Sequence, residues 1–387
     1  MRIVWVNERA DFVGGAERYL ADAARLCRDR GHESMLLYGV SGWMEPTFTS
    51  VFDAAFPMVD VARQLKELAP DIVFVHQLRE VEVTRAIAAC GVPTLRYFHD
   101  HRLFCLREHK YTTLGHETCT RTVGIGCYPC LGFIQRGDGP RRVRLRTLGE
   151  VRNEQAVNQG FSAWMVGSEY MKAHVAAHGF DADRILVNPP FVLEPPPPEG
   201  TVRRDPNLLL FVGALLRGKG LDLLLEALTQ LRAEVRLRVV GTGAQEALHR
   251  ELAAKLGVAA RVEFVGRRDR AGIDRDYREA ACVVVPSRTP ETFGLIGPEA
   301  LLRETPVVAS AVGGTGEWLL DGKTGRSFPS GDVGALVAAI ERMLADADTA
   351  HRLATEGRDH VRTHFGAEAH ATRLLGALEK VRSGGRT

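Results

Sequence analysis

The chain has 387 residues, of which 45% are hydrophobic and 25% charged, and its formal net charge is +2. This length accommodates two domains with separate cores. The small net charge gives no strong field for nucleic acid, which we therefore do not expect as a partner. No apolar run is long enough to span a membrane, and the apolar start of the chain is too short for a signal peptide. We expect a cytoplasmic protein with no transmembrane segment.

In the first half of the chain, short apolar runs alternate with helical patterns, which predicts a parallel sheet covered by helices. A helix is expected at residues 16–30, because its apolar side chains recur on one face. The predicted strands cover residues 2–7, 34–38, 71–76, 94–99, 162–166 and 184–187.

A proline-dense segment at residues 188–200 predicts a stiff, extended linker between two domains. The second half then repeats the alternation of strands and helices. Its predicted strands cover residues 208–213, 236–240, 262–265, 282–286 and 307–311, and its predicted helices cover 221–231, 245–256, 272–281 and 333–344.

Two glutamates, Glu291 and Glu299, flank a stretch that contains Gly294, Gly297 and Pro298 directly after a predicted buried strand. The glycines and the proline argue against one continuous helix between the two carboxylates. The first glutamate is therefore expected in a loop and the second in the first turn of a helix. Backbone N–H groups at such a helix start favour phosphate, and carboxylates favour hydroxyl-rich ligands. The pattern predicts a site for a phosphate flanked by sugars.

Three further motifs accompany this stretch. They are Gly-Gly-Ala-Glu at 14–17, Phe-Val-Gly at 211–213 followed by Arg-Gly-Lys-Gly at 217–220, and Val-Gly-Gly at 312–314 followed by Glu317. Together, in this order, the four motifs resemble those of the retaining glycosyltransferases with the GT-B fold, specifically family 4 (glycosyl transferases group 1), which carry an E-x7-E signature.

The resemblance implies an α/β fold of two Rossmann-like domains that face each other across a cleft. The N-terminal, acceptor-side domain is expected at residues 1–195, with a cysteine-containing insertion near 102–135. The C-terminal domain, expected at 200–365, binds the nucleotide sugar. A helix within residues 366–387 is expected to return to the first domain.

The resemblance also implies roles for individual residues. Lys219 and Arg217 would neutralise the diphosphate. Family members carry an arginine directly after the first glycine, where this chain has Ala214, so Arg217 would act from three residues further on. Glu291 would hold donor-sugar hydroxyls, and His99, at the end of a strand, would lie against the transferred sugar. The other implied substrate-binding residues are Gly14, Gly15, Asp100, Gly213, Arg267, Phe293, Gly294, Leu295 and Glu299.

Four cysteines, Cys105, Cys119, Cys127 and Cys130, lie within the expected insertion and end in a C-x2-C pair. Such a cluster in a reducing compartment suggests a structural tetrahedral zinc site. The first two spacings are irregular, however, so free thiols or disulfides stay open as the alternative. The insertion is not general to family 4.

A basic run follows this segment, at Arg141, Arg142, Arg144, Arg146 and Arg152. It could meet an anionic acceptor or, peripherally, a membrane surface, but a solvated helix face is the favoured interpretation. Three D-x-D triplets, at 181–183, 274–276 and 346–348, are expected to be polar turns. We therefore expect no catalytic metal and no cofactor beyond the donor substrate.

The resulting hypothesis is a retaining glycosyltransferase that moves a sugar from a UDP- or GDP-linked donor to a hydroxyl of a polysaccharide, a glycolipid or a small-molecule natural product. The alternatives are a nucleotide-sugar epimerase or a phosphorylase on the same fold, or a non-catalytic nucleotide-binding protein. The sequence leaves the acceptor, the donor sugar and base, and the oligomeric state open.

Overall fold

The computed structural model describes residues 1–39, 44–112, 115, 117–136, 143–197, 200 and 202–384, with the backbone alone at 135, 136 and 143. Contacts between Cα atoms divide the chain into two units. The first unit comprises Met1–Glu108, Arg121–Phe191 and Ala367–Thr387, and the second comprises His109–Thr120 and Val192–Gly366. This division places part of the expected insertion in the second unit and the last helix in the first.

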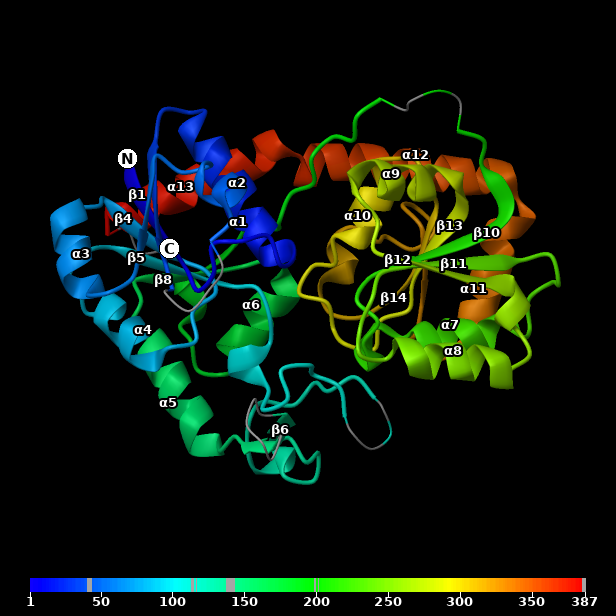
Figure 1. Ribbon diagram of the computed structural model, residues 1–387, viewed down its shortest axis with the longest axis horizontal. Coiled ribbons are helices and arrows are strands. Elements are labelled where there is room, and N and C mark those ends of the chain that lie inside the picture. Colours follow the sequence, from blue (N-terminus) through cyan, green and yellow to red (C-terminus); the bar gives the residue numbers. More distant parts are fainter. Residues whose placement is uncertain are drawn as a thin grey trace. The chain divides into compact units, whose positions relative to one another are not determined.

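The first unit, in which Figure 1 labels strands β1, β4, β5 and β8, is built on a seven-stranded parallel sheet. The order of its strands is β3-β2-β1-β4-β5-β8-β9. Its strands are β1 (Arg2–Asn7), β2 (Glu33–Tyr38), β3 (Ala54–Pro57), β4 (Ile72–Val75), β5 (Thr94–Phe98), β8 (Ala163–Val166) and β9 (Ile185–Val187). The sequence did not predict the edge strand β3, because its residues are half-buried or exposed and form no marked apolar run.

Helices cover both faces of this sheet. Successive side chains of a strand point to opposite faces, so β1 sends Trp5 into one hydrophobic core and Val4 into the other. Leu374 and Leu378 of the last helix lie in the same core as Trp5, so that helix packs on this unit. The helices are α1 (Gly15–Arg28), α2 (Pro46–Thr49), α3 (Val61–Leu68), α4 (Val81–Ala88), α5 (Leu148–Asn158), α6 (Glu169–Ala176) and α13 (Ala367–Arg382).

The second unit is built on a six-stranded parallel sheet with the order β12-β11-β10-β13-β14-β15. Its strands are β10 (Asp205–Val212), β11 (Arg236–Val240), β12 (Val262–Gly266), β13 (Ala280–Val285), β14 (Val307–Ser310) and β15 (Arg326–Phe328). Its helices are α7 (Leu221–Leu228), α8 (Glu246–Lys255), α9 (Arg270–Glu279), α10 (Ile296–Leu301), α11 (Val333–Ala345) and α12 (Ala347–Phe365). The sequence analysis missed β15 and α12.

Two of the three D-x-D triplets are not the polar turns that the sequence predicted. Asp274 and Asp276 lie buried in α9, where arginine side chains pair with them at 2.7–3.1 Å. Asp346 caps α12, because its Oδ1 accepts the backbone N–H groups of Asp348 and Thr349. In the sequence alone, acidic residues that cap a helix or form ion pairs cannot be told from acidic residues in exposed turns.

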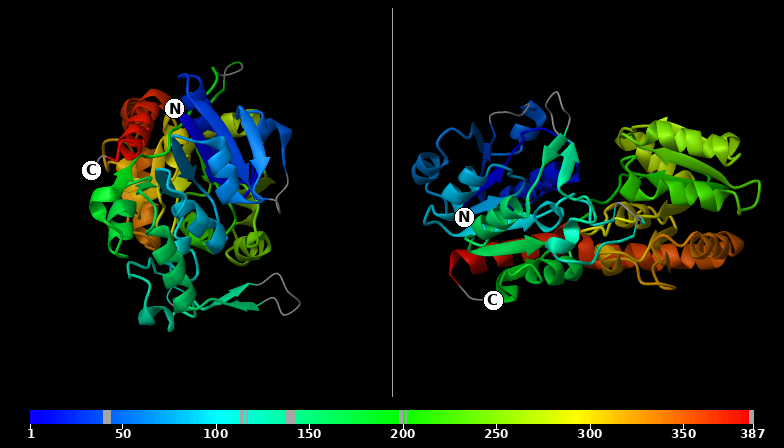
Figure 2. Two further views of the ribbon diagram at one scale, coloured as in Figure 1. Left: turned by 90° about the vertical axis from the view of Figure 1, so that its left-hand side faces the viewer. Right: turned by 90° about the horizontal axis from the view of Figure 1, so that it is seen from below.

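The expected insertion is shared between the two units. The described residues at 109–112 and 117–120 form the two arms of a short antiparallel hairpin in the second unit, in which Tyr111 bridges Thr118 and the N–H of Cys119 donates to the carbonyl of Lys110 at 2.7 Å. The rest of the insertion belongs to the first unit. It leads into a second antiparallel pair (Figure 2), β6 (Ile134–Arg136) and β7 (Val143–Leu145).

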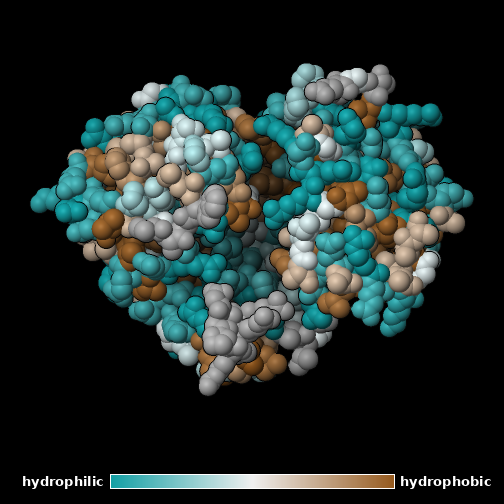
Figure 3. All heavy atoms as spheres, in the orientation of Figure 1, coloured by the Kyte–Doolittle hydropathy of each residue, from teal (hydrophilic) through white to brown (hydrophobic). Residues whose placement is uncertain are grey.

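The basic run after the insertion does not form one solvated face. Arg141 and Arg142 lie outside the described residues. Arg144 and Arg152 are exposed, but Arg146 is buried and pairs with Glu108 and Glu154. Hydrophilic residues dominate the visible surface of each unit (Figure 3). Within the described part of the chain, no helix is both long and apolar enough to cross a membrane.

One glycine in the second unit is required by packing. A Cβ added to Gly297, in α10, would overlap the six-membered ring of Trp318, which is fully buried and donates its indole N–H to the carbonyl of Phe293 at 2.8 Å. We therefore expect Gly297→Ala to lower the free energy of unfolding by about 1–3 kcal/mol, because a methyl group overpacks this core.

The matched control is Gly376→Ala in α13, where no atom other than the neighbouring backbone of the same helix lies within 4 Å of an added Cβ. It should raise stability by about 0.5–1 kcal/mol, because alanine restricts the unfolded chain. Equal effects of the two changes in denaturant unfolding would contradict the packing argument.

Candidate functional site

The motifs of the second unit meet where its sheet changes direction. The chain runs outward from β10 to β11 and β12, and then returns to continue from β13 on the other side. Ligands of open parallel sheets bind outside the carboxyl ends of the strands at such a switch point. The glycine-rich loop that ends in Lys219 follows β10, and the loop that carries Glu291 follows β13. Parallel strands therefore bring the two predicted loops to one edge of the sheet.

Lys219 and Glu291 form an ion pair at this edge. The Lys219 Nζ lies 2.7 Å from Glu291 Oε1, and the hydroxyl of Ser287 donates to the same oxygen at 2.6 Å. The lysine side chain is 35% exposed and the glutamate side chain 14% exposed. The cation thus stays accessible at the sheet edge while the carboxylate is held in a fixed place.

The backbone of Glu291 is fixed from a second direction. It forms a parallel bridge with Gly313, and its carbonyl accepts the N–H of Gly314 at 2.6 Å. A Cβ on Gly313, whose φ is +62°, would collide with the Glu291 backbone. Glycine at this place therefore lets the two loops touch, which accounts for the Val-Gly-Gly motif.

Glu299 lies in the first turn of α10, as the sequence predicted, and it has a different partner. The hydroxyl of Tyr277 donates to Glu299 Oε2 at 2.9 Å. Burial, reinforced by the nearby carboxylate, raises the pKa of Tyr277 well above its ordinary value, so the phenol stays protonated. Between the two glutamates, the N–H groups of Gly294 and Leu295 donate to no acceptor among the described residues.

The other predicted residues of this unit differ in how far they are exposed to solvent. Arg217 and Arg267 are exposed, and the Nε of Arg267 donates to Thr242 Oγ1 at 3.3 Å. Gly213 lies against Gly241, because a Cβ added to Gly241 would overlap the carbonyl oxygen of Gly213. The side chain of Phe293 is buried in the hydrophobic core against Phe365.

The hairpin of residues 109–120 packs against the lysine loop, which the sequence analysis did not anticipate. The hydroxyl of Thr118 donates to the carbonyl of Arg288 at 2.8 Å, and the N–H of Arg288 donates to the carbonyl of Gly218 at 2.8 Å. A Cβ on Gly218 would lie 3.0 Å from the Tyr111 ring. Arg288 itself is buried and pairs with Asp222 at 2.6 Å.

The sheet of the first unit also has a switch point, between β1 and β4, and the predicted Gly14 and Gly15 follow β1. Gly14 and Gly15 are exposed at the start of α1, where the N–H of Gly14 donates to Glu17 Oε2 at 3.0 Å. His99 follows β5, and its Nε2 lies 2.9 Å from Nδ1 of the buried His76, a residue that the sequence analysis missed.

Burial decides the protonation of this histidine pair. It lowers the pKa of His99 to about 3, with Arg96 acting in the same direction and Asp100 opposing. Burial likewise holds the pKa of His76 well below its ordinary value. Both imidazoles are therefore neutral at pH 7 and act as hydrogen-bonding groups. Burial opposes ionisation of Asp100, but the charge and backbone N–H of Arg102 outweigh it and lower its pKa.

The four insertion cysteines are divided between the two units. Cys105, Cys127 and Cys130 belong to the first unit, whereas Cys119 is part of the hairpin of the second. No disulfide joins any of the seven cysteines, all of which lie in the described part of the chain. Within that part, no three side chains of His, Cys, Asp or Glu gather closely enough to hold a metal ion.

Two protein-family models match long stretches of the sequence. A model of Glycosyltransferase Family 4 matches residues 13–193, and a model of Glycosyl transferases group 1 matches residues 197–360. The D-inositol 3-phosphate glycosyltransferase of Xylanimonas cellulosilytica is 35% identical over 249 residues, 59% of this chain and 58% of that protein. Glycogen synthase of Mycobacterium tuberculosis is 34% identical over 51% of this chain and 46% of that protein.

The chain thus matches about half the length of these curated relatives. Among solved structures, Anabaena HepE in complex with UDP has a TM-score of 0.75 at 18% identity, covering 98% of this chain and 100% of that chain. This likeness shows the fold. Because the two family models between them match most of the sequence, the chain belongs to the family 4 glycosyltransferases, which have the GT-B fold.

Proposed function

We propose that the chain is a retaining glycosyltransferase that moves a sugar from a UDP- or GDP-linked donor to a hydroxyl of its acceptor. The observation that carries the proposal is the ion pair of Lys219 and Glu291, which puts a cation beside a fixed carboxylate at the switch point of the second unit. A diphosphate needs the first group and sugar hydroxyls need the second. The relative HepE, whose structure contains UDP, supports a uridine nucleotide as the first donor to test.

The proposed reaction is a same-face substitution. The bond between the anomeric carbon and the diphosphate oxygen breaks, and the diphosphate leaves with the electron pair. The acceptor oxygen bonds to the anomeric carbon on the same face, and its proton passes to the leaving diphosphate oxygen. Lys219 would stabilise the charge that develops on the diphosphate, with the exposed Arg217 as a second cation.

The remaining residues would position the donor. Glu291 would accept hydrogen bonds from hydroxyls of the donor sugar, and Glu299 would accept them from the ribose. The backbone N–H groups of Gly294 and Leu295, which have no acceptor among the described residues, would donate to the phosphate. Gly213 and Arg267 line the adjoining loops and would lie near the nucleotide.

The first unit would supply further substrate contacts. His99 is neutral at pH 7, so it would bind a hydroxyl through a hydrogen bond and contribute no charge. Gly14 and Gly15 would offer backbone N–H groups, and Asp100 is held ionised by Arg102.

Replacing Lys219 by alanine should lower kcat/KM for the nucleotide sugar by roughly 100-fold or more, because a preorganised donor to the leaving group is lost. Stability should change little, since a partly exposed ion pair contributes at most about 1 kcal/mol. The matched control is Lys255→Ala on α8, which removes an exposed lysine from the same unit. Equal activity of the two variants in a transfer assay would contradict the role of Lys219.

Glu291→Gln and Glu299→Gln should separate recognition of the sugar from recognition of the nucleotide. The first change should lower transfer at least about tenfold while leaving the Kd of UDP nearly unchanged, because it loses a charged acceptor for sugar hydroxyls. Glu299→Gln should instead raise the Kd of UDP itself by a similar factor. Calorimetric titration with UDP and a transfer assay check both, and parallel losses in the two variants would undo the assignment.

Thr118→Val should raise the KM for the donor about 3–10-fold with little change in kcat, because one hydrogen bond to Arg288, in the loop that carries Glu291, is lost. Thr118→Ser keeps the hydroxyl and should restore the wild-type KM. If the valine and serine variants have the same KM, the hairpin does not position this loop.

A further inference from the structure

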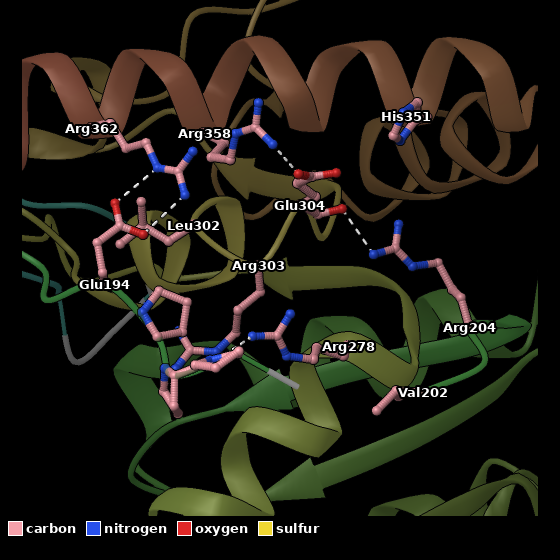
Figure 4. A pocket seen from close by; sticks show the side chains of 13 residues that line it. Glu194, Val202, Arg204, Arg278, Leu302, Arg303, Glu304, His351, Arg358 and Arg362 are labelled. Carbon is pink, nitrogen blue, oxygen red and sulfur yellow. Dashed lines mark hydrogen bonds and ion pairs between the residues drawn. The ribbon is translucent and has the colours of Figure 1, made fainter. Parts of the chain in front are cut away.

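A concave feature of the second unit lies away from the motif loops. It is a cavity of about 620 Å³ (Figure 4). Its lining includes Arg204 directly before β10, Arg278 just before β13, and Glu304 shortly before β14. Parallel strands begin at one edge of a sheet and end at the other. The cavity therefore lies at the edge opposite the one that carries Lys219 and Glu291.

Five of the thirteen residues that line the cavity are arginines. Its volume lies in the range of sites for small organic ligands, about 300–1,000 Å³. Arginine is the side chain best suited to phosphate, because its planar fork donates two parallel hydrogen bonds. The charged lining residues are the arginines Arg204, Arg278, Arg303, Arg358 and Arg362 and the glutamates Glu194 and Glu304.

Four of these arginines have carboxylate partners. Arg362 donates two hydrogen bonds to Glu194, at 2.8 and 3.0 Å, from α12 to the linker segment. Arg358 pairs with Glu304, as Figure 4 shows. Arg278 and Arg303 share one carboxylate, that of Asp274 in α9.

Arg204 differs from the other four. Its Nη2 donates to the backbone carbonyl of Glu304 at 2.9 Å, and within the described residues no carboxylate lies at ion-pair distance. Burial lowers the pKa of its guanidinium group, with Glu304 partly opposing. The wall of the cavity thus holds a half-buried cation whose nearest partner is an uncharged carbonyl.

The partner of Arg204 is itself held in an unusual conformation. Glu304 has φ +55°, a left-handed backbone that non-glycine residues seldom adopt. In that conformation its carbonyl accepts from Arg204 while its carboxylate pairs with Arg358. Backbone of this kind persists where its surroundings fix it, and it gathers at ligand sites and switch regions.

We propose that this cavity binds a small organic phosphate with at least two negative charges. Arg204 supplies the cation, which has no carboxylate partner among the described residues, and Arg362 exchanges Glu194 for a phosphate oxygen. The Glu194 side chain is 58% exposed, so its carboxylate turns into solvent without being buried unpaired. The site is separate from the donor site, and it does not depend on the proposed transfer reaction.

Calorimetric titration of the full chain with sodium pyrophosphate tests the proposal. Lys219→Ala serves as the parent, because it removes the phosphate-binding cation proposed at the opposite edge. Arg204→Gln in this parent should raise Kd at least about tenfold, whereas Glu194→Gln should lower it several-fold by removing the competing carboxylate. The matched control is Arg342→Gln, which removes an exposed charge from α11 outside the cavity and should leave Kd unchanged.

Three results would each overturn the proposal. They are the absence of binding to the parent, the same Kd for Arg204→Gln and Arg342→Gln, and weaker binding by Glu194→Gln. If sulfate binds with the same affinity at matched ionic strength, the cavity attracts anions in general, and the proposal of a phosphate site is also refuted. If Arg204→Gln does not fold, Arg362→Gln replaces it, because its side chain is about half exposed, and the same outcomes decide.

Discussion

The constraint on which the proposed chemistry depends is the fixed position of Glu291. Its backbone is bridged to Gly313, and its carboxylate is held by Lys219 and Ser287. The contacts with Gly313 and Lys219 are not available to an isolated loop, because Gly313 follows β14 while Lys219 follows β10. Loops that follow three strands of one sheet therefore fix the position of the Glu291 carboxylate. That arrangement preorganises both a cation and an anion before a substrate arrives, which is how a site stabilises charge that develops during a reaction.

The two edges of the same sheet carry different chemistry. At the carboxyl edge, glycine-rich loops hold an accessible lysine against Glu291 and leave the backbone N–H groups of Gly294 and Leu295 without an acceptor among the described residues. At the opposite edge, arginines from the linker side, from α9 and from α12 surround a cavity. Arg303 connects the two edges, since it reaches Asp274 and also donates to the carbonyl of Glu299 at 2.8 Å. The single helix α10 thus separates the proposed ribose contact from the arginine-lined cavity.

Local patterns predicted much of this structure. The apolar runs located most strands of both sheets, and Gly294 and Pro298 correctly placed Glu291 in a loop and Glu299 in a helical turn. Features that depend on contacts between distant residues were missed. The hairpin bond from Thr118 to Arg288 joins residues 170 positions apart, and the His76–His99 pair joins two separate strands. The four cysteines suggested a metal site, but sequence spacing could not show that the Cys119 hairpin belongs to the other unit.

The central claim is that the second unit holds a nucleotide diphosphate between Lys219 and the two glutamates. Thermal unfolding of the wild-type chain in the presence of UDP, GDP, ADP and the corresponding nucleotide sugars tests it most directly, since a ligand that binds the folded state alone raises its stability. The account predicts that one uridine or guanosine diphosphate raises Tm and that Glu299→Gln clearly reduces the rise at the same ligand concentration. A Tm that no nucleotide changes, or a rise that survives this substitution in full, would contradict it.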